Sequence, residues 1–197
     1  MTDFELNAKD RHLAAQIPRN SLQSYLSGKD LPAEVQLNPN GNAGLRKPMG
    51  VFITLKKKGK LRGCVGHIHP LGPIWKELRD VGILAATKDT RFKPLTLDEL
   101  PAIQISITLL SPPEYVEGPY QFEVGVHGII FELGRHRAVF LPQVAPQWGW
   151  DRETTFQQLA KKAGLAHDAW KKTDARFALF RGQVFDEKGK TLRSDEG

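Results

Sequence analysis

Two pairs of strand-like segments, each joined by a short glycine-containing turn, constrain the fold of this chain more than any other feature. Residues 50–55 are rich in β-branched and aromatic side chains, and the turn at 56–60 returns the chain through 61–68. A second such pair covers 128–141, with its turn at 134–137. Alternating or β-branched runs joined by turns of this kind predict β-hairpins, in which neighbouring strands are antiparallel.

Helical patterns surround these hairpins rather than alternating regularly with strands. Residues 7–26 and 73–86 carry apolar residues at helical spacing, and Pro18 is expected to kink the first helix or to start a second one. Strict alternation at 103–110 predicts a half-buried strand. Asp151 or Thr154 is expected to cap a further helix that ends near residue 162, and 177–185 reads as a final strand. The order favours an α+β fold, with a mixed or antiparallel sheet flanked by helices.

Length and composition narrow the class of protein. A chain of 197 residues fits one domain, or one domain with a small second lobe, and residues 188–197 are expected to form a flexible tail. The single cysteine excludes an internal disulfide and a multi-cysteine metal site, and it suits a reducing compartment. The sequence predicts neither a signal peptide nor a membrane helix, so we expect a cytoplasmic protein.

The single cysteine, Cys64, lies in the segment Leu-Arg-Gly-Cys-Val-Gly at 61–66. Its flanking glycines, Gly63 and Gly66, permit a bulge or the close approach of a ligand to the backbone. In a regular strand, Lys60, Arg62 and Cys64 would share one face, and a cation beside a thiol lowers its pKa. This pattern is one that a reactive thiol would need. The alternative is a buried structural cysteine, which is common because free cysteine is among the most buried residue types.

Positive charge is concentrated around this segment. Residues 35–76 contain eight Lys and Arg and no Asp or Glu, although the whole chain carries a formal charge of only +6. Such a field attracts anionic ligands, and RNA binding through it is a weaker third hypothesis. The alternative is that the lysines of 56–60 form a solvated hairpin tip.

Histidines supply the remaining candidate chemistry. His127 lies between glycines at a strand start and could pair with a thiolate or act as a general acid–base; otherwise it is a turn histidine. His67 and His69 form an H-x-H pair that lacks a third ligand nearby in the sequence, so no metal is predicted. No cofactor is predicted either. The polar segment 88–92, which contains Arg91, could line a cleft.

In combination these motifs resemble the AMMECR family, which includes the protein A component of the AmmeMemoRadiSam system. The resemblance rests on the Leu-Arg-Gly-Cys-Val-Gly motif and on segments matching in order over most of the chain, at 50–55, 89–95, 105–112, 126–128, 140–144 and 149–151. It implies one AMMECR-type domain over 1–187, a compact α+β structure with a larger and a smaller lobe. The lysine-rich turn at 56–60 and Pro18 depart from the family pattern.

The resemblance also carries functional expectations. The family has no established activity; its members are expected to act with a Memo-like partner and a radical-SAM enzyme in modifying a biomolecule. Carried over to this sequence, the candidate site comprises Arg62, Gly63, Cys64 and Gly66, with Arg91 and His127 as further members. Two hypotheses follow: an enzyme with Cys64 as nucleophile or redox thiol, Arg62 lowering its pKa and His127 as base, or a non-catalytic module that binds an anion or a partner.

Overall fold

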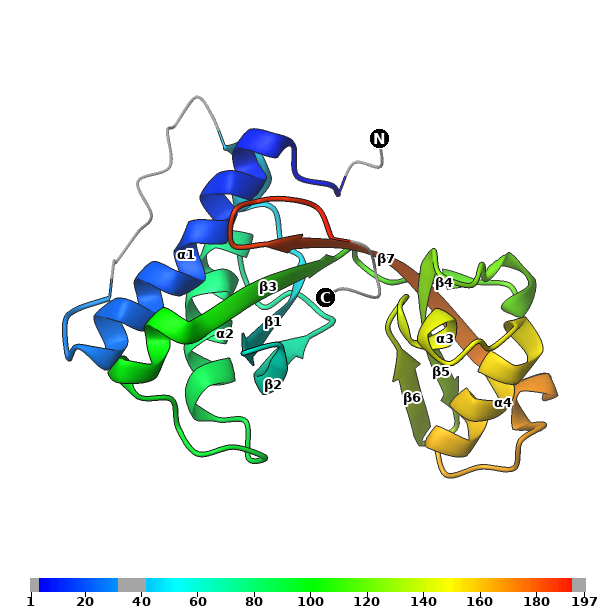
Figure 1. Cartoon of the computed structure of the whole chain (residues 1–197). Coiled ribbons are helices and arrows are strands. Elements are labelled where there is room, and N and C mark those ends of the chain that lie inside the picture. Colours follow the sequence, from blue (N-terminus) through cyan, green and yellow to red (C-terminus); the bar gives the residue numbers. More distant parts are fainter. Residues whose placement is uncertain (1–3, 32–41, 193–197) are drawn as a thin grey trace. The chain divides into compact units, whose positions relative to one another are not determined.

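The computed structural model describes residues 4–31 and 42–192, and it divides them into two compact units (Figure 1). The larger unit holds the chain up to Leu110 together with the segment that begins at Gln183, and the smaller unit is Ser111–Gly182. The last strand, β7 (Arg176–Asp186), contributes residues to both. The fold is α+β with antiparallel strand pairing, as the sequence predicted.

The larger unit is a sheet covered by two helices. Its strands β1 (Gly50–Lys57), β2 (Lys60–His67) and β3 (Ile103–Leu110) pair in the order β2-β1-β3 and continue to β7. Burial alternates along most of β1 and in the first half of β3, whereas residues 107–110 of β3 are all buried. The helix α2 (Ile74–Thr87) packs against β1 and β2 (Figure 1). The predicted first hairpin and the half-buried strand at 103–110 are therefore present.

Pro18 does not start a second helix, which was one of the two outcomes that the sequence predicted. The helix α1 is continuous over Ala8–Leu26, and the side chain of Asn7 caps it by accepting a hydrogen bond from the Asp10 amide. Pro18 is buried where α1 meets α2, because a Cβ built on Gly82 would lie 3.2 Å from the proline ring. Helix–helix packing thus outweighs the hydrogen bond that proline removes.

The smaller unit builds a separate apolar core. Its strands are β4 (Glu114–Val116), β5 (His127–Leu133), β6 (His136–Phe140) and part of β7, and β4 and β5 both pair with β7. Two helices follow β6, the short α3 (Val144–Gln147) and α4 (Arg152–Lys162), whose N-cap is Asp151. Aromatic rings fill the core, including Phe131, Phe156 and Phe177.

Short 3-10 helices connect these elements: η1 (Ala43–Arg46), η2 (Leu97–Ala102), η3 (Pro119–Gln121) and η4 (Ala169–Lys171). The segment 32–49, whose Asn, Pro and Gly residues are typical of a loop, contains η1, and its residues 32–41 lie outside the described part of the chain. Over the residues that the structure describes, no helix combines the length and apolar character needed to cross a bilayer.

The C-terminal segment differs from the expected tail. The chain turns at Gly189, and the Leu192 amide donates to the Val184 carbonyl, so residues 188–192 fold back on β7. A Cβ on Gly189 would approach the backbone of His12 in α1, which shows that this turn packs against the larger unit. Residues 193–197 lie outside the described chain.

Candidate functional site around Cys64

Cys64 lies on β2 at the edge of the sheet in the larger unit, and its thiol is partly exposed. It pairs with Thr54 of β1, and the two side chains are in contact, with Sγ 3.4 Å from the threonine hydroxyl. Thr54 in turn pairs with Ser106 of β3. These three residues form a polar row on the face of the sheet opposite to the one that α2 covers, because adjacent Gly63 and Leu55 face the helix.

The predicted alignment of Lys60, Arg62 and Cys64 on one face is wrong. Leu55 pairs with Gly63, but Lys56 pairs with Leu61, so a β-bulge leaves Arg62 as an extra residue in β2. Lys60 pairs with Lys57 and Cys64 with Thr54. Since Lys57 and Thr54 are three residues apart and point to opposite faces, their partners Lys60 and Cys64 do so as well.

Arg62 is committed to contacts within the fold. Its guanidinium donates to both carboxylate oxygens of Glu99 and to the Lys93 carbonyl, and its side chain is only 15% exposed. Lys57 also donates to Glu99. These hydrogen bonds, that of Arg62 first, lower the pKa of Glu99 to about 2. Arg62 therefore ties β2 to the 88–96 segment and to η2, which makes it a positioning residue.

A second ion pair lies directly beside Cys64. The backbone amide of Cys64, which faces away from β1, donates to Asp89 Oδ2 at 2.8 Å. Both carboxylate oxygens of Asp89 accept from Arg91, at 2.9 and 2.7 Å. The hydrogen bond from Arg91 is the main reason why the pKa of Asp89 is held far below its usual range. The carboxylate is thus charged at neutral pH.

Arg91 is the cation that Asp89 links to the backbone of Cys64. Its pKa is raised, first by the hydrogen bond to Asp89 and to a smaller extent by the negative charge of that carboxylate. Its side chain remains 56% exposed. The sequence analysis placed Arg91 in the candidate site but missed Asp89. The only signal for Asp89 was its position two residues before Arg91, where it forms an Asx turn by accepting from the Arg91 amide.

The motif glycines serve packing. A Cβ on Gly63 would overlap the carbonyl oxygen of Ala85 in α2, so glycine allows the helix to approach the strand. A Cβ on Gly66 would overlap the ring of Phe52, its partner on β1. Neither observation points to a bound ligand, and the predicted ligand-binding role of these two glycines stays untested.

His127 does not belong to the same unit as the other candidate site residues. His127 belongs to the smaller unit, whereas Cys64 and Arg91 belong to the larger one. His127 Nδ1 accepts from the Glu123 amide, as a turn histidine would, and its pKa is lowered mainly by burial and also by the charge of Arg181. It is therefore neutral at neutral pH, and its role as a base stays a prediction.

His67 of the H-x-H pair is occupied by a carboxylate. Its Nε2 lies 2.6 Å from Glu77 Oε2 of α2, and the Glu77 side chain is almost completely buried. Within 4–31 and 42–192, no three His, Cys, Asp or Glu side chains are grouped so that they could hold a metal ion.

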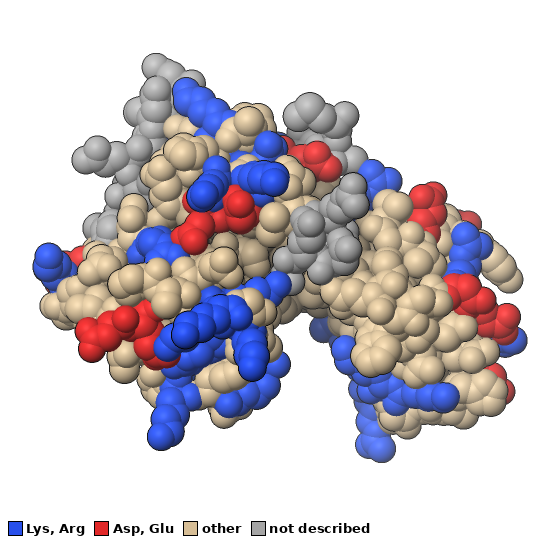
Figure 2. Space-filling view, viewed as in Figure 1, with Lys and Arg blue, Asp and Glu red and all other residues tan. Residues whose placement is uncertain are grey.

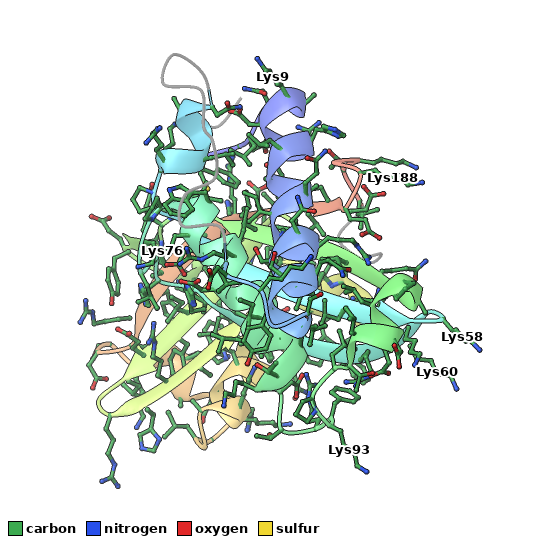
Figure 3. The ribbon with its side chains drawn as sticks, turned by 90° about the vertical axis from the view of Figure 1, so that its left-hand side faces the viewer. Lys9, Lys58, Lys60, Lys76, Lys93 and Lys188 are labelled. Atoms are coloured by element: carbon green, nitrogen blue, oxygen red, sulfur yellow. The ribbon has the colours of Figure 1, made fainter. Side chains whose placement is uncertain are left out.

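Basic side chains surround this site. Lys and Arg gather on the part of the larger unit that carries the β1–β2 hairpin (Figure 2). Lys58 and Lys60 project from the hairpin tip, and Lys93 projects from the neighbouring loop at the same end of the unit (Figure 3). Lys9 lies at the opposite end (Figure 3).

Comparison with known proteins gives one consistent result. The model of the AMMECR1 family matches residues 15–185. Relatives include protein Mbar_A1807 from Methanosarcina barkeri, 37% identical over 95% of this chain and 93% of its own length, and a protein from Methanothermobacter thermautotrophicus, 37% identical over 93% and 97%. The crystal structure of uncharacterized protein PH0010 from Pyrococcus horikoshii superposes with a TM-score of 0.79 at 30% identity, covering 95% of this chain and 98% of that one. Fold, family model and relatives agree over nearly the whole chain, which therefore belongs to the AMMECR1 family.

Proposed function

We propose that this protein is an enzyme that uses Cys64 as its nucleophile and Arg91 to bind an anionic group of the substrate. The observation that supports this proposal most directly is the Asp89–Arg91 pair, in which Asp89 accepts a hydrogen bond from the backbone amide of Cys64 itself and Arg91 stays exposed. A fixed cation near a thiol favours the thiolate, the form that attacks electrophiles.

Each residue of the site has a distinct part in this proposal. Asp89 accepts hydrogen bonds from Arg91 and from the Cys64 amide, so it fixes the guanidinium relative to the backbone of Cys64. The guanidinium has N–H groups beyond the two that Asp89 accepts, and these are available to a carboxylate or phosphate. Arg62 positions the loop that carries this pair. His127 belongs to the smaller unit and has no assigned part in this proposal; its role as a base stays a prediction from the sequence.

Alkylation by iodoacetamide tests the proposal. We expect native Cys64 to react without denaturant at pH 7, and Arg91→Gln to react about fivefold more slowly, the effect of roughly 1 kcal/mol of charge interaction under strong solvent screening. The double variant Asp89→Asn/Arg91→Gln removes both charges and controls for the carboxylate that the single variant leaves unpaired. Lys76→Gln, a charge removed elsewhere on this unit, is expected to leave the rate unchanged. A thiol that reacts only after unfolding, or a rate insensitive to Arg91, would contradict the proposal.

A second candidate function has its own support. Gly63, Gly66 and Arg62 all make packing or internal polar contacts, so these contacts account for the motif without chemistry at the thiol. In that case the protein is a binding module, and Cys64→Ser would leave the affinity for its partner intact. Family membership supports a Memo-like protein and a radical-SAM enzyme as the proposed partners. Size-exclusion chromatography of the three purified proteins, alone and mixed, would test their association.

A further inference from the structure

We propose that the larger unit binds the phosphodiester backbone of nucleic acid through a basic surface that consists of Lys58, Lys60, Lys88, Arg91 and Lys93. The lysines at 56–60 were interpreted above as either a solvated hairpin tip or part of an anion-attracting field. In the structure, basic residues of a second segment lie beside this hairpin tip. The inference concerns binding alone and does not depend on whether Cys64 reacts.

Two segments distant in sequence are held together to form this surface. Lys58 and Lys60 come from the β1–β2 hairpin, whereas Lys88, Arg91 and Lys93 come from the loop after α2. The Cys64 amide bonds to Asp89, and the Arg62 guanidinium bonds to the Lys93 carbonyl, so the loop is fixed along the edge of β2. Lys58, Lys60 and Lys93 accordingly project from one end of the unit (Figure 3).

Two of the carboxylates near this basic surface form ion pairs within the protein. Glu99 accepts from Lys57 and Arg62, and Asp89 accepts from Arg91. Asp98, at the start of η2, is the remaining carboxylate of the 88–99 segment. Within the described parts of the chain, Lys58, Lys60, Lys88 and Lys93 have no ion-pair partner, so their charges are available to a ligand. Net positive charge is therefore left on the surface.

The extent of the surface indicates a chain of phosphates rather than a single anion. Between Cys64 and Lys60, where β2 begins, the strand advances by four residues, one of them the bulged Arg62, which corresponds to roughly 10–13 Å at the usual rise of a β-strand, and the turn residue Lys58 lies beyond Lys60. One phosphate cannot bridge cations over that distance, whereas successive phosphates of a nucleic acid can. Phe92 is partly buried beneath the Arg91 guanidinium, so the surface offers charge rather than aromatic stacking. Contacts of this kind bind the backbone without reading the base sequence.

A membrane surface is the less favoured anionic partner. Peripheral attachment combines basic residues with apolar side chains that enter the bilayer. Leu61 is the one large exposed apolar side chain of the described β1–β2 hairpin. The surface therefore lacks an apolar anchor of useful size.

Fluorescence anisotropy with a labelled single-stranded 20-nucleotide RNA of mixed sequence tests the proposal. We expect the RNA affinity to weaken as the salt concentration rises. In Lys58→Glu/Lys60→Glu the slope of log K against log salt should be smaller in magnitude by about 1.4, because each lost contact between a lysine and a phosphate of single-stranded RNA lowers it by about 0.7. The affinity of that variant at low salt should fall about tenfold or more. Lys9→Glu/Lys188→Glu changes the net charge equally but lies away from the hairpin tip, and it should bind as the wild type does (Figure 3).

The alternative outcomes are distinct. Equal losses in the two double variants would show that only net charge matters and would overturn the proposal. Absence of RNA binding together with binding to vesicles of phosphatidylserine and phosphatidylcholine, or to polyglutamate, would reassign the surface to a membrane or to an acidic protein. Cys64→Ser is included in the same titration: we expect it to bind RNA normally, so a failed alkylation test would leave this result standing.

Discussion

Replacing Gly63 by alanine is expected to lower the free energy of unfolding by about 3 kcal/mol, the upper part of the range for overpacked cores. Gly63 is buried, and a Cβ there would overlap the Ala85 carbonyl oxygen. That oxygen belongs to the backbone of α2, so no side chain can turn aside to make room, and the helix and the strand must separate. Urea unfolding followed by circular dichroism measures the loss directly.

A matched substitution isolates the steric cause. Gly118→Ala adds the same methyl group in extended backbone, where the nearest atom, on the Tyr120 ring, is 3.6 Å away, and it should change stability by less than about 0.5 kcal/mol. If Gly63→Ala proved as stable as the wild type, the tight contact between β2 and α2 would be wrong. Faster alkylation of Cys64 in Gly63→Ala without denaturant would indicate that the separated strand exposes its thiol.

Removing the Arg62 side chain is expected to destabilise the protein by about 2 kcal/mol at pH 7, the order of magnitude for charge-assisted hydrogen bonds. Arg62→Ala leaves Glu99 with Lys57 as its cationic partner and releases the Lys93 carbonyl. The loop that carries Asp89 and Arg91 would lose one of its ties to β2. Urea unfolding at a series of pH values checks both the size and the origin of this effect.

The pH dependence follows from Glu99. Its pKa falls from 4.5 to about 2 in the folded protein, chiefly through Arg62. A carboxyl with a lowered pKa stabilises the fold fully above its unfolded pKa, and that stabilisation is lost as the pH falls through the folded value. The difference between wild type and Arg62→Ala should therefore narrow between pH 4.5 and pH 2. It should not vanish, because the bond to the Lys93 carbonyl does not titrate.

A control variant separates the effect of the hydrogen-bond geometry of Arg62 from the effect of its positive charge. Arg62→Lys retains the charge but cannot form the paired contacts to both Glu99 oxygens, so it should recover only part of the stability. A wild-type pH profile for Arg62→Ala would contradict the positioning role. A slower alkylation of Cys64 in a fully stable Arg62→Ala protein would instead favour the direct effect on the thiol that the sequence predicted.

Much of the fold could be predicted because local patterns and tertiary packing agree. The hairpin at 50–68, the strand at 103–110, the helix α4 with its Asp151 cap and the strand β7 all follow from periodicity and turn residues. The second helix that could have started at Pro18 did not form, and the proline packs against Gly82 of α2 inside one continuous helix. The strand β4 and the helix α3 were missed because each is too short to show a period.

The sequence by itself determined the α+β class, the family and the segment around Cys64, since turns, periodicity and a dense motif are local properties of the chain. Only the tertiary structure decided how that segment is used. One extra residue in β2 places Lys60 on the face opposite to Cys64 and allows Arg62 to form its ion pair with Glu99. A loop 25 residues away in the sequence places Asp89, which is paired with Arg91, at the Cys64 amide. Strand register and loop closure depend on packing between distant segments, which no local pattern records.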